Sequence, residues 1–161
     1  MKRRIFACLL AVFLLVGCGA DPVGRTVTHK DLTLILPADF LSAEELGLEN
    51  ADGADILYGR HSLVFKGLAE SKESLKAMSL KEYTDSVVSA NKKDATPKAS
   101  GAGYLFTYEA KVGEEVYSYT VATYEGQENF WILQFYCPKD TLAENQPEID
   151  IILEGIQPQK G

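Results

Sequence analysis

The spacing of apolar and polar residues changes along the chain, and each change marks a new secondary-structure element. Arg25 to Thr28 and Leu32 to Leu36 are short runs rich in strand-forming residues, separated by a three-residue turn. They predict an N-terminal hairpin, which Pro37 ends. Ile56 to Tyr58 and Ser62 to Leu68 predict a second pair of strands, or one bent strand.

Two capping boxes predict helix starts. Ser42 with Glu45 has the S-x-x-E form and predicts a short helix that Gly47 ends. Ser79 with Glu82 has the same form and predicts a longer helix, extending to about Asn91. Its apolar residues fall at helical spacing, on one stripe formed by Leu80, Tyr83, Val87 and Val88.

The C-terminal segment predicts a last helix. Pro147 suits a first helical turn, Asn145 is the expected cap, and Leu142 is assigned to a short turn before it. The predicted apolar stripe consists of Ile149, Ile152, Leu153 and Ile156.

Between these two helices the pattern alternates with a period of two, which predicts three consecutive antiparallel strands. A tight turn at Gly113-Glu114 pairs the first two of these strands so that their aromatic residues share one face of the hairpin. That face contains Tyr104, Phe106, Tyr108 and Ala110 opposite Tyr117, Tyr119, Val121 and Thr123. The other face contains the small side chains of Thr107, Ser118, Thr120 and Ala122.

The third strand has two possible registers. A four-residue loop from Gly126 to Asn129 places Trp131, Leu133 and Phe135 beside the small side chains, whereas a five-residue loop moves Trp131 to the aromatic face. In either register both faces of the sheet are apolar, so each needs a cover. The expected fold class is therefore α+β, with an antiparallel β-sheet flanked by helices on both faces.

The N-terminus has the features of an export signal. Lys2, Arg3 and Arg4 precede an apolar stretch of twelve residues from Ile5 to Val16, which is too short to span a bilayer. The sequence Leu15-Val16-Gly17-Cys18 resembles the bacterial lipobox. The alternative is an ordinary signal peptide, or an uncleaved anchor, with a coincidental cysteine.

The lipobox resemblance implies lipidation of Cys18 and cleavage just before it. Residues 1–17 are then a lipoprotein signal peptide, residues 18–24 a lipidated N-terminus and short tether, residues 25–157 a single domain, and residues 158–161 a tail. Several acyl chains together anchor a protein stably. The expected location is the extracytoplasmic face of a bacterial cell membrane, with the lipid as the membrane contact.

Composition narrows the possible partners. The chain has 161 residues, a net charge of -7 and 46% hydrophobic residues, so it has enough apolar material for one folded domain. Cleavage removes three basic residues and no acidic residue, which changes the net charge to -10. A domain this acidic is not expected to bind nucleic acid.

Cysteine usage excludes an internal disulfide in the mature chain. Cys8 leaves with the signal and Cys18 carries lipid, which leaves Cys137. Cys137 shares strand parity with Trp131 and Phe135, so we expect a buried, inert thiol.

A search for catalytic, cofactor or metal residues gives no candidate set. His29 and His61 lie in unrelated segments, and no Cys/His metal spacing occurs. Glu49, Asp52 and Asp55 are acidic but lack the spacing of a calcium loop. Gly101-Ala102-Gly103 leads into a strand, unlike a dinucleotide fingerprint, and the pairs Glu44-Glu45 and Glu114-Glu115 are expected to be solvated.

The element order resembles a known family. An opening strand ended by Pro37, a middle helix, the three strands within residues 104–136 and the closing helix are similar to the PsbP-like α/β/α sandwich, over roughly residues 23–156. This family includes photosystem extrinsic subunits, a nuclear-transport GTPase regulator and many bacterial lipoproteins. The resemblance implies a non-catalytic partner-binding or assembly domain, and no functional residue is carried over from it.

Two functions follow from these observations. The first is a lipid-anchored, monomeric, non-catalytic module that binds an unidentified protein partner. The alternative is a small-molecule or glycan-binding lipoprotein, suggested by Trp131 and the tyrosines. An aromatic cavity of roughly 300 Å³ or more favours the alternative, whereas an exposed apolar patch favours a protein partner.

Overall fold

The computed structural model describes residues 24–47, 53–75, 77–91 and 94–159. The predicted signal peptide, Cys18 and the residues up to 23, together with Glu49 and Asp52, lie outside the described residues.

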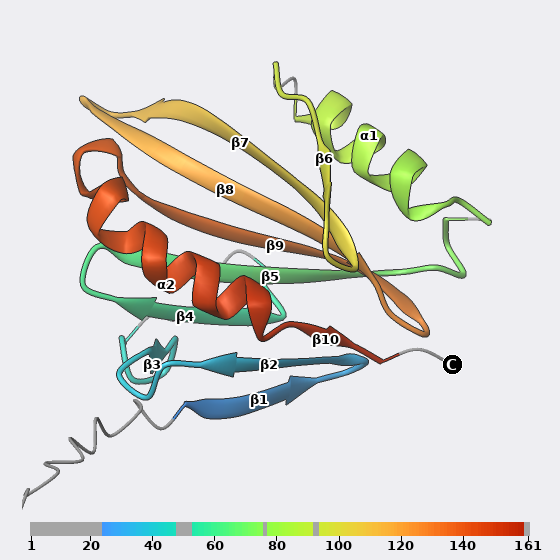
Figure 1. Ribbon diagram of the computed structural model, residues 1–161, viewed down its shortest axis with the longest axis horizontal. Helices are drawn as coiled ribbons and strands as arrows, with labels where there is room; N and C mark the ends of the chain where they lie inside the picture. The colour runs from blue at the N-terminus through green and yellow to red at the C-terminus, as the bar shows by residue number, and fades with distance from the viewer. Residues whose placement is uncertain (1–23, 48–52, 76, 92–93, 160–161) are drawn as a thin grey trace, which may run out of the picture.

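Within these residues, a seven-stranded antiparallel sheet has the order β3-β4-β5-β9-β8-β7-β6 (Figure 1). All six pairs of neighbouring strands are antiparallel. The strands are β3 (Leu41–Ser42), β4 (Ile56–Arg60), β5 (Leu63–Ser71), β6 (Lys98–Ser100), β7 (Gly103–Val112), β8 (Glu115–Glu125) and β9 (Asn129–Pro138). The second predicted pair of strands is thus confirmed as β4 and β5.

The N-terminal hairpin is also confirmed, as β1 (Arg25–His29) and β2 (Leu32–Leu36). It forms a separate three-stranded sheet with β10 (Gln157–Pro158), an arrangement that the sequence pattern did not predict. The side chains of Leu32, Leu34 and Leu36 are fully buried in the larger of the two core clusters.

The predicted register of β7 and β8 is confirmed, and the structure selects one of the two registers considered for β9. Phe106 lies opposite Val121 and Tyr108 opposite Tyr119, so one face of the hairpin is aromatic. Ala122 lies opposite Leu133, and Thr120 opposite Phe135. Of the two registers considered for Trp131, the structure has the one that places this side chain on the face of the small residues.

The two faces of the sheet are covered by different helices, as expected. α1 (Leu80–Ala90) packs Tyr83, Val87 and Val88 against Phe106, Val121 and Phe130 of the aromatic face. α2 (Leu142–Glu154) packs Ile149 and Ile152 into the cluster that contains Trp131, Leu133 and the leucines of β2. Figure 1 shows α2 in front of the sheet and α1 beside β6 and β7. The fold class is therefore the predicted α+β arrangement.

The predicted helix between Ser42 and Gly47 is wrong. The capping-box contacts form, since the Ser42 amide donates to the Glu45 carboxylate at 2.6 Å and the Glu45 amide donates to the Ser42 hydroxyl at 3.3 Å. However, the chain makes only turns over residues 43–47, after β3. Leu46 is 37% exposed and Gly47 has a φ of +67°, so no apolar stripe is buried that would stabilise a helix.

The predicted start of the last helix is also wrong, because α2 begins at Leu142, directly after a 3₁₀ turn (Lys139–Thr141). Asn145 lies inside the helix, where its amide donates to the Thr141 carbonyl at 3.0 Å and to the Ser62 hydroxyl at 3.1 Å. Pro147 is likewise inside the helix. The missing proline N–H leaves one helical hydrogen bond unmade, and packing of the apolar stripe outweighs this loss.

The carboxylate of Asp31 joins the two sheets. It accepts hydrogen bonds from the Trp131 indole at 2.8 Å, the Glu128 amide at 2.7 Å, and the Asn129 amide and side chain at 2.9 and 3.0 Å. Asp31 is 7% exposed. Burial raises the pKa of this carboxyl, but the four hydrogen bonds together hold it below its ordinary value.

Candidate functional site

The aromatic side of the main sheet is only partly covered by α1. A row of tyrosines, Tyr108 on β7, Tyr119 on β8 and Tyr136 on β9, crosses the neighbouring strands and stays partly exposed. Lys66 on β5 lies opposite Gln134 on β9, on the same side of the sheet. We call these five residues, Lys66, Tyr108, Tyr119, Gln134 and Tyr136, the tyrosine face.

The tyrosine rings stack on one another. The ring centroids of Tyr108 and Tyr119 are 4.7 Å apart with an interplanar angle of 7°, and those of Tyr119 and Tyr136 are 5.5 Å apart at 24°. Because neighbouring rings cover each other's faces, the partly exposed row presents mainly ring edges. A sugar stacks on an open aromatic face, so this geometry disfavours a glycan platform. Amphipathic tyrosine edges are typical of protein interfaces.

The hydroxyls of Tyr108 and Tyr119 remain protonated at neutral pH, because the pKa of each is raised. Burial, and then the neighbouring Tyr119, raise the pKa of Tyr108, although the hydrogen bond from Gln134 lowers it. Burial also raises the pKa of Tyr119. The Gln134 side-chain amide donates to the Tyr108 hydroxyl at 2.9 Å and holds this ring in place. Tyr108 and Tyr119 are therefore neutral, amphipathic side chains on this surface.

A small pocket lies where α1 meets the tyrosine face. Its volume is about 140 Å³, and it is lined by α1 residues Val87 and Asn91 and by the sheet residues Lys66, Leu68, Phe106, Tyr108, Val121, Ile132 and Gln134. We call it the α1 pocket. This volume is well below the roughly 300 Å³ expected for a small-molecule site. The α1 pocket therefore favours a protein partner over the ligand-binding alternative.

Lys66 is the charged residue of the α1 pocket. Among the described residues, no carboxylate lies within ion-pair distance of its ammonium group. Four other lysines do form ion pairs. The pairs are Lys30 with Asp55, Lys72 with Glu125, Lys81 with Asp85, and Lys139 with Glu109. In a chain of net charge -7, an ammonium group at the pocket rim gives this surface a local positive charge.

The same side of the sheet continues as an apolar surface toward β3. Gly59 on β4 lies opposite Val64 on β5, and Val64 lies opposite Tyr136. Leu41, opposite Gly59 on β3, is 42% exposed. The partly exposed Val64 and the exposed Leu41 are thus apolar side chains on this side of the sheet, separated by the buried Gly59.

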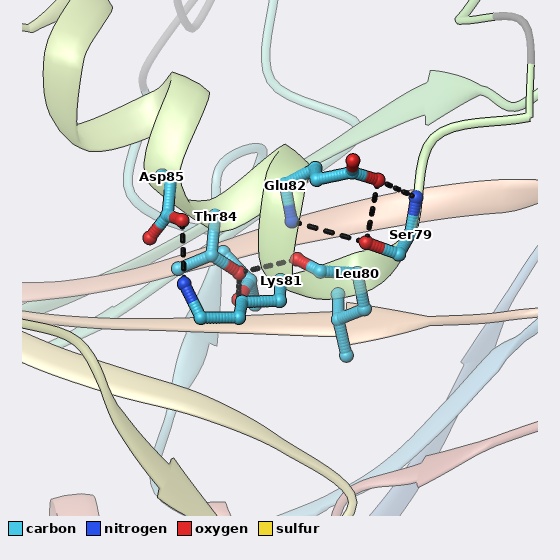
Figure 2. Close-up of polar contacts among 7 residues, drawn as sticks. Ser79, Leu80, Lys81, Glu82, Thr84 and Asp85 are labelled. Carbon is cyan, nitrogen blue, oxygen red and sulfur yellow. Dashed lines mark hydrogen bonds and ion pairs between the residues drawn. The ribbon is translucent and has the colours of Figure 1, made fainter.

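α1 forms one wall of the pocket, and its N-terminus is fixed by the predicted capping box (Figure 2). The Glu82 amide donates to the Ser79 hydroxyl at 3.3 Å, and the Ser79 amide donates to the Glu82 carboxylate at 2.9 Å. Lys81 and Asp85 form an ion pair one turn apart at 2.7 Å. These contacts satisfy amide groups at the N-terminus that have no partner within the helix.

A buried pair of threonines attaches α1 to the sheet. The hydroxyls of Thr84 on α1 and Thr123 on β8 are 2.6 Å apart, and both residues are 0% exposed. The Thr84 hydroxyl also donates to the Leu80 carbonyl at 2.7 Å. This contact fixes α1 over Thr123 and leaves the tyrosine face beside it.

Of the residues considered at the sequence level for chemistry, the structure brings His29 and Asp55 together, with His29 Nε2 3.6 Å from Asp55 Oδ1. Cys137 is free, fully buried and opposite Ser118, which confirms its predicted position in the core. His29 lies edge-on to the Trp131 ring, and His61 is exposed in the turn between β4 and β5. Gly101 lies in the turn between β6 and β7.

Asp55 is the described member of the predicted acidic loop. Its carboxylate accepts hydrogen bonds from the Lys30 ammonium at 2.5 Å and the Ala69 amide at 2.8 Å. Burial raises the pKa of Asp55, while Lys30, the Ala69 amide and His29 lower it to a net value below the ordinary one. Within the described ranges, no three His, Cys, Asp or Glu side chains are placed to hold a metal ion.

For the part of the chain that the structure covers, no helix has both the length and the apolar character required to cross a bilayer.

Sequence reasoning missed Lys66, Gln134, Thr84 and Asp31. Strand parity places Lys66 and Gln134 on the aromatic side once the strand order is known, but β5 and β9 are far apart in the chain. Alternation predicts the aromatic face on which the tyrosine row lies. The structure adds that these rings stack with their edges outward.

The chain was compared with known proteins. No family model and no curated protein matches it. Among solved structures, cyanobacterial PsbP (CyanoP) from Synechocystis sp. PCC 6803 is similar with a TM-score of 0.57 and 10% identity, over 88% of this chain and 96% of that chain. The fold is PsbP/Mog1-like.

Two further structures are similar to this fold. The Saccharomyces cerevisiae Ran-binding protein Mog1p has a TM-score of 0.51 and 10% identity, over 85% of this chain and 96% of that chain. A protein from Bacteroides thetaiotaomicron VPI-5482 has a TM-score of 0.58 and 12% identity, over 86% of this chain. The match spans 49% of that protein's length. The expected sandwich fold is thereby confirmed.

Proposed function

We propose that this protein is a lipid-anchored, extracytoplasmic module that binds a partner protein through the tyrosine face and catalyses no reaction. The observation that carries the proposal is the partly exposed row of Tyr108, Tyr119 and Tyr136, whose rings stack on one another and so present mainly their edges. Rigid aromatic side chains contribute large contact areas at low entropic cost. The similarity to the Ran-binding protein Mog1p is consistent with a binding role for the fold.

The proposed anchor rests on the sequence Leu15-Val16-Gly17-Cys18. Wild-type protein should incorporate labelled palmitate in the bacterium, whereas Cys18→Ala should accumulate as an unlabelled, unprocessed precursor. Equal palmitate labelling of the two proteins would contradict the anchor.

Binding is tested by site-specific photo-crosslinking of the lipidated protein in its native membranes. A photoreactive residue at Tyr136 reports on the tyrosine face, and one at Ile151, which is 55% exposed on α2, reports on the opposite side. We expect a discrete adduct from position 136 that is missing at position 151. The same adducts from both positions, or no adduct from either, would contradict binding through this face.

A further inference from the structure

The α1 pocket has the size of one apolar side chain. Five of its lining residues are apolar or aromatic hydrocarbon side chains, namely Leu68, Val87, Phe106, Val121 and Ile132. For comparison, an apolar cavity of about 150 Å³ binds one benzene molecule. A volume of about 140 Å³ therefore accepts the side chain of one leucine, isoleucine or phenylalanine, but not a larger ligand.

The rim of the pocket determines which charge can lie beside that side chain. Lys66 lines the pocket and has no carboxylate partner within the described part of the chain. Gln134 and Tyr108 add neutral amide and hydroxyl groups. An incoming carboxylate would pair with Lys66, whereas an incoming lysine or arginine would be repelled. A partly desolvated ammonium group therefore selects for an acidic neighbour.

We propose that the α1 pocket takes one apolar side chain of a partner protein, from a segment in which a neighbouring aspartate or glutamate pairs with Lys66. The inference rests on the proposed binding function and specifies its partner. The rest of the segment lies along Tyr108, Tyr119 and Tyr136. An apolar anchor in a closely fitting pocket, surrounded by contacts that exclude water, is the usual source of affinity at protein interfaces.

The test uses the full-length protein in detergent and a displayed library of random peptides. Enriched peptides should share an apolar residue next to an aspartate or glutamate. Lys66→Glu should weaken the affinity of these peptides by about tenfold or more, which corresponds to about 1.4 kcal/mol. Replacing the acidic residue of the peptide by lysine should restore binding to Lys66→Glu, because the charge pair is then reversed.

Two further variants separate the pocket from general surface effects. Ile132→Phe fills the pocket and should weaken binding without removing any charge. Lys98→Glu makes the same charge change at an exposed residue of β6, which lies opposite Leu105 on the α2 side of the sheet. This control should leave the affinity for the peptides unchanged. Thermal unfolding followed by the fluorescence of Trp131 reports whether each variant folds. If Ile132→Phe does not fold, the charge reversal at Lys66 decides the question.

The inference is overturned if no peptide is enriched, if the enriched peptides lack an acidic residue, or if Lys98→Glu weakens binding as much as Lys66→Glu. Sedimentation equilibrium tests whether the protein dimerises. If it does, and if Lys66→Glu abolishes the dimer, the tyrosine face binds a second copy of the chain and the inference is overturned.

The native-membrane crosslink distinguishes this inference from the proposed function. An adduct at Tyr136 that persists in Lys66→Glu rejects the specified partner but keeps the binding function. An adduct that is already missing in the wild-type protein rejects the binding function itself, whereas an adduct that forms in the wild type and is lost in Lys66→Glu supports both.

Discussion

The hydrogen bonds to Asp31 are predicted to be among the largest polar contributions to stability. The Trp131 indole is fully buried, and its N–H donates to Asp31, which lies 100 residues earlier in the chain. In Asp31→Ala this donor, which belongs to a fully buried side chain, loses its acceptor. Leaving one buried donor unsatisfied costs about 1 to 3 kcal/mol, and hydrogen bonds to a charged group contribute about 1.5 to 3 kcal/mol each.

The other three donors belong to Glu128 and Asn129, which are exposed and partly exposed, so water can replace much of what they lose. The expected loss for Asp31→Ala is therefore about 3 to 5 kcal/mol of the free energy of unfolding. For a domain of this size it corresponds to a fall in Tm of roughly 10 to 20 °C.

Asp31→Asn should not rescue the contact. Oδ1 of Asp31 accepts from Trp131 and the Asn129 side chain, and Oδ2 accepts from the two backbone amides. An asparagine turns one of these oxygens into an NH₂ group, which then faces two donors. Asn129→Ala is the matched control, because it removes one donor and keeps the carboxylate. We expect this control to cost about 1 kcal/mol.

The effect should depend on pH in a defined direction. Because the pKa of Asp31 is lowered in the folded protein, its contribution is fully present above its ordinary pKa and is lost as the pH falls through the folded value. The difference in stability between wild type and Asp31→Asn should thus be constant at pH 5 to 7 and shrink below about pH 4. Because wild type and Asp31→Asn share all other carboxyl groups, the effects of those groups on the pH dependence of stability cancel in this difference.

The assay is urea unfolding followed by the fluorescence of Trp131, which is the one tryptophan of the sequence. Asp31→Asn within 1 kcal/mol of wild type, or a difference that does not change down to pH 2, would refute the reasoning.

Three smaller predictions follow from other buried contacts. Cys137 should resist thiol alkylation in the native protein and react on unfolding, and Cys137→Ser should cost on the order of 1 to 3 kcal/mol; rapid native alkylation would contradict its burial. Thr84→Val and Thr123→Val should each destabilise by about 1 to 2 kcal/mol, while the double variant loses less than their sum; strict additivity would argue against the contact between their hydroxyls. Gly103→Ala should destabilise the protein by about 1 to 3 kcal/mol in thermal unfolding, because the added Cβ collides with the Thr123 carbonyl. Gly101→Ala is the control: its added Cβ meets no atom, so it measures only the cost of a positive φ of 56°.

Local signals predicted the elements whose stability is itself local. The capping box at Ser79 and the stripe through Tyr83 and Val87 gave α1 correctly, because the same residues cap the helix and bury its face. The register of β7 and β8 also followed from the sequence, since a short turn at Gly113 fixes the parity of both strands.

Where distant contacts decide the outcome, the sequence pattern gave an incomplete or wrong prediction. Ser42 and Glu45 make the capping contacts, but no neighbouring surface buries the turn, so no helix forms. α2 starts at Leu142, and Asn145, inside the helix, donates to Ser62 in the turn between β4 and β5, a contact between residues 83 positions apart. Asp31 appeared to be an ordinary turn residue, because its partners lie in the turn between β8 and β9.

The same long-range logic explains why the α1 pocket was not predicted. Alternation assigns Lys66 to a face of β5, but its role depends on β9 lying next to β5 and on the carboxylates of the chain lying elsewhere. Neither condition can be derived from local spacing.

The position of β1 relates the proposed anchor to the proposed binding surface. The guanidinium of Arg25 lies 4.9 Å from the ring centroid of Tyr58, and Tyr58 packs against the core cluster that α2 covers. The described fold thus begins on the side opposite the tyrosine face. Cys18 precedes Gly24 by six residues, which span at most about 22 Å when extended. If Cys18 carries the lipid, this short connection places the α2 side toward the membrane and the tyrosine face toward the aqueous phase.

This orientation is testable in vesicles that contain the lipidated protein. Thr26→Cys introduces a thiol at an exposed position on β1, and Lys66→Cys introduces one on the tyrosine face, while Cys137 is buried and does not compete. Each variant is labelled with a small maleimide and with a bulky polyethylene-glycol maleimide. The bilayer should slow the bulky reagent selectively at position 26, because that position faces the headgroups and lies within reach of the anchor. Equal ratios of bulky to small labelling at the two positions would contradict the orientation, and a lower ratio at position 66 would place the tyrosine face against the membrane instead.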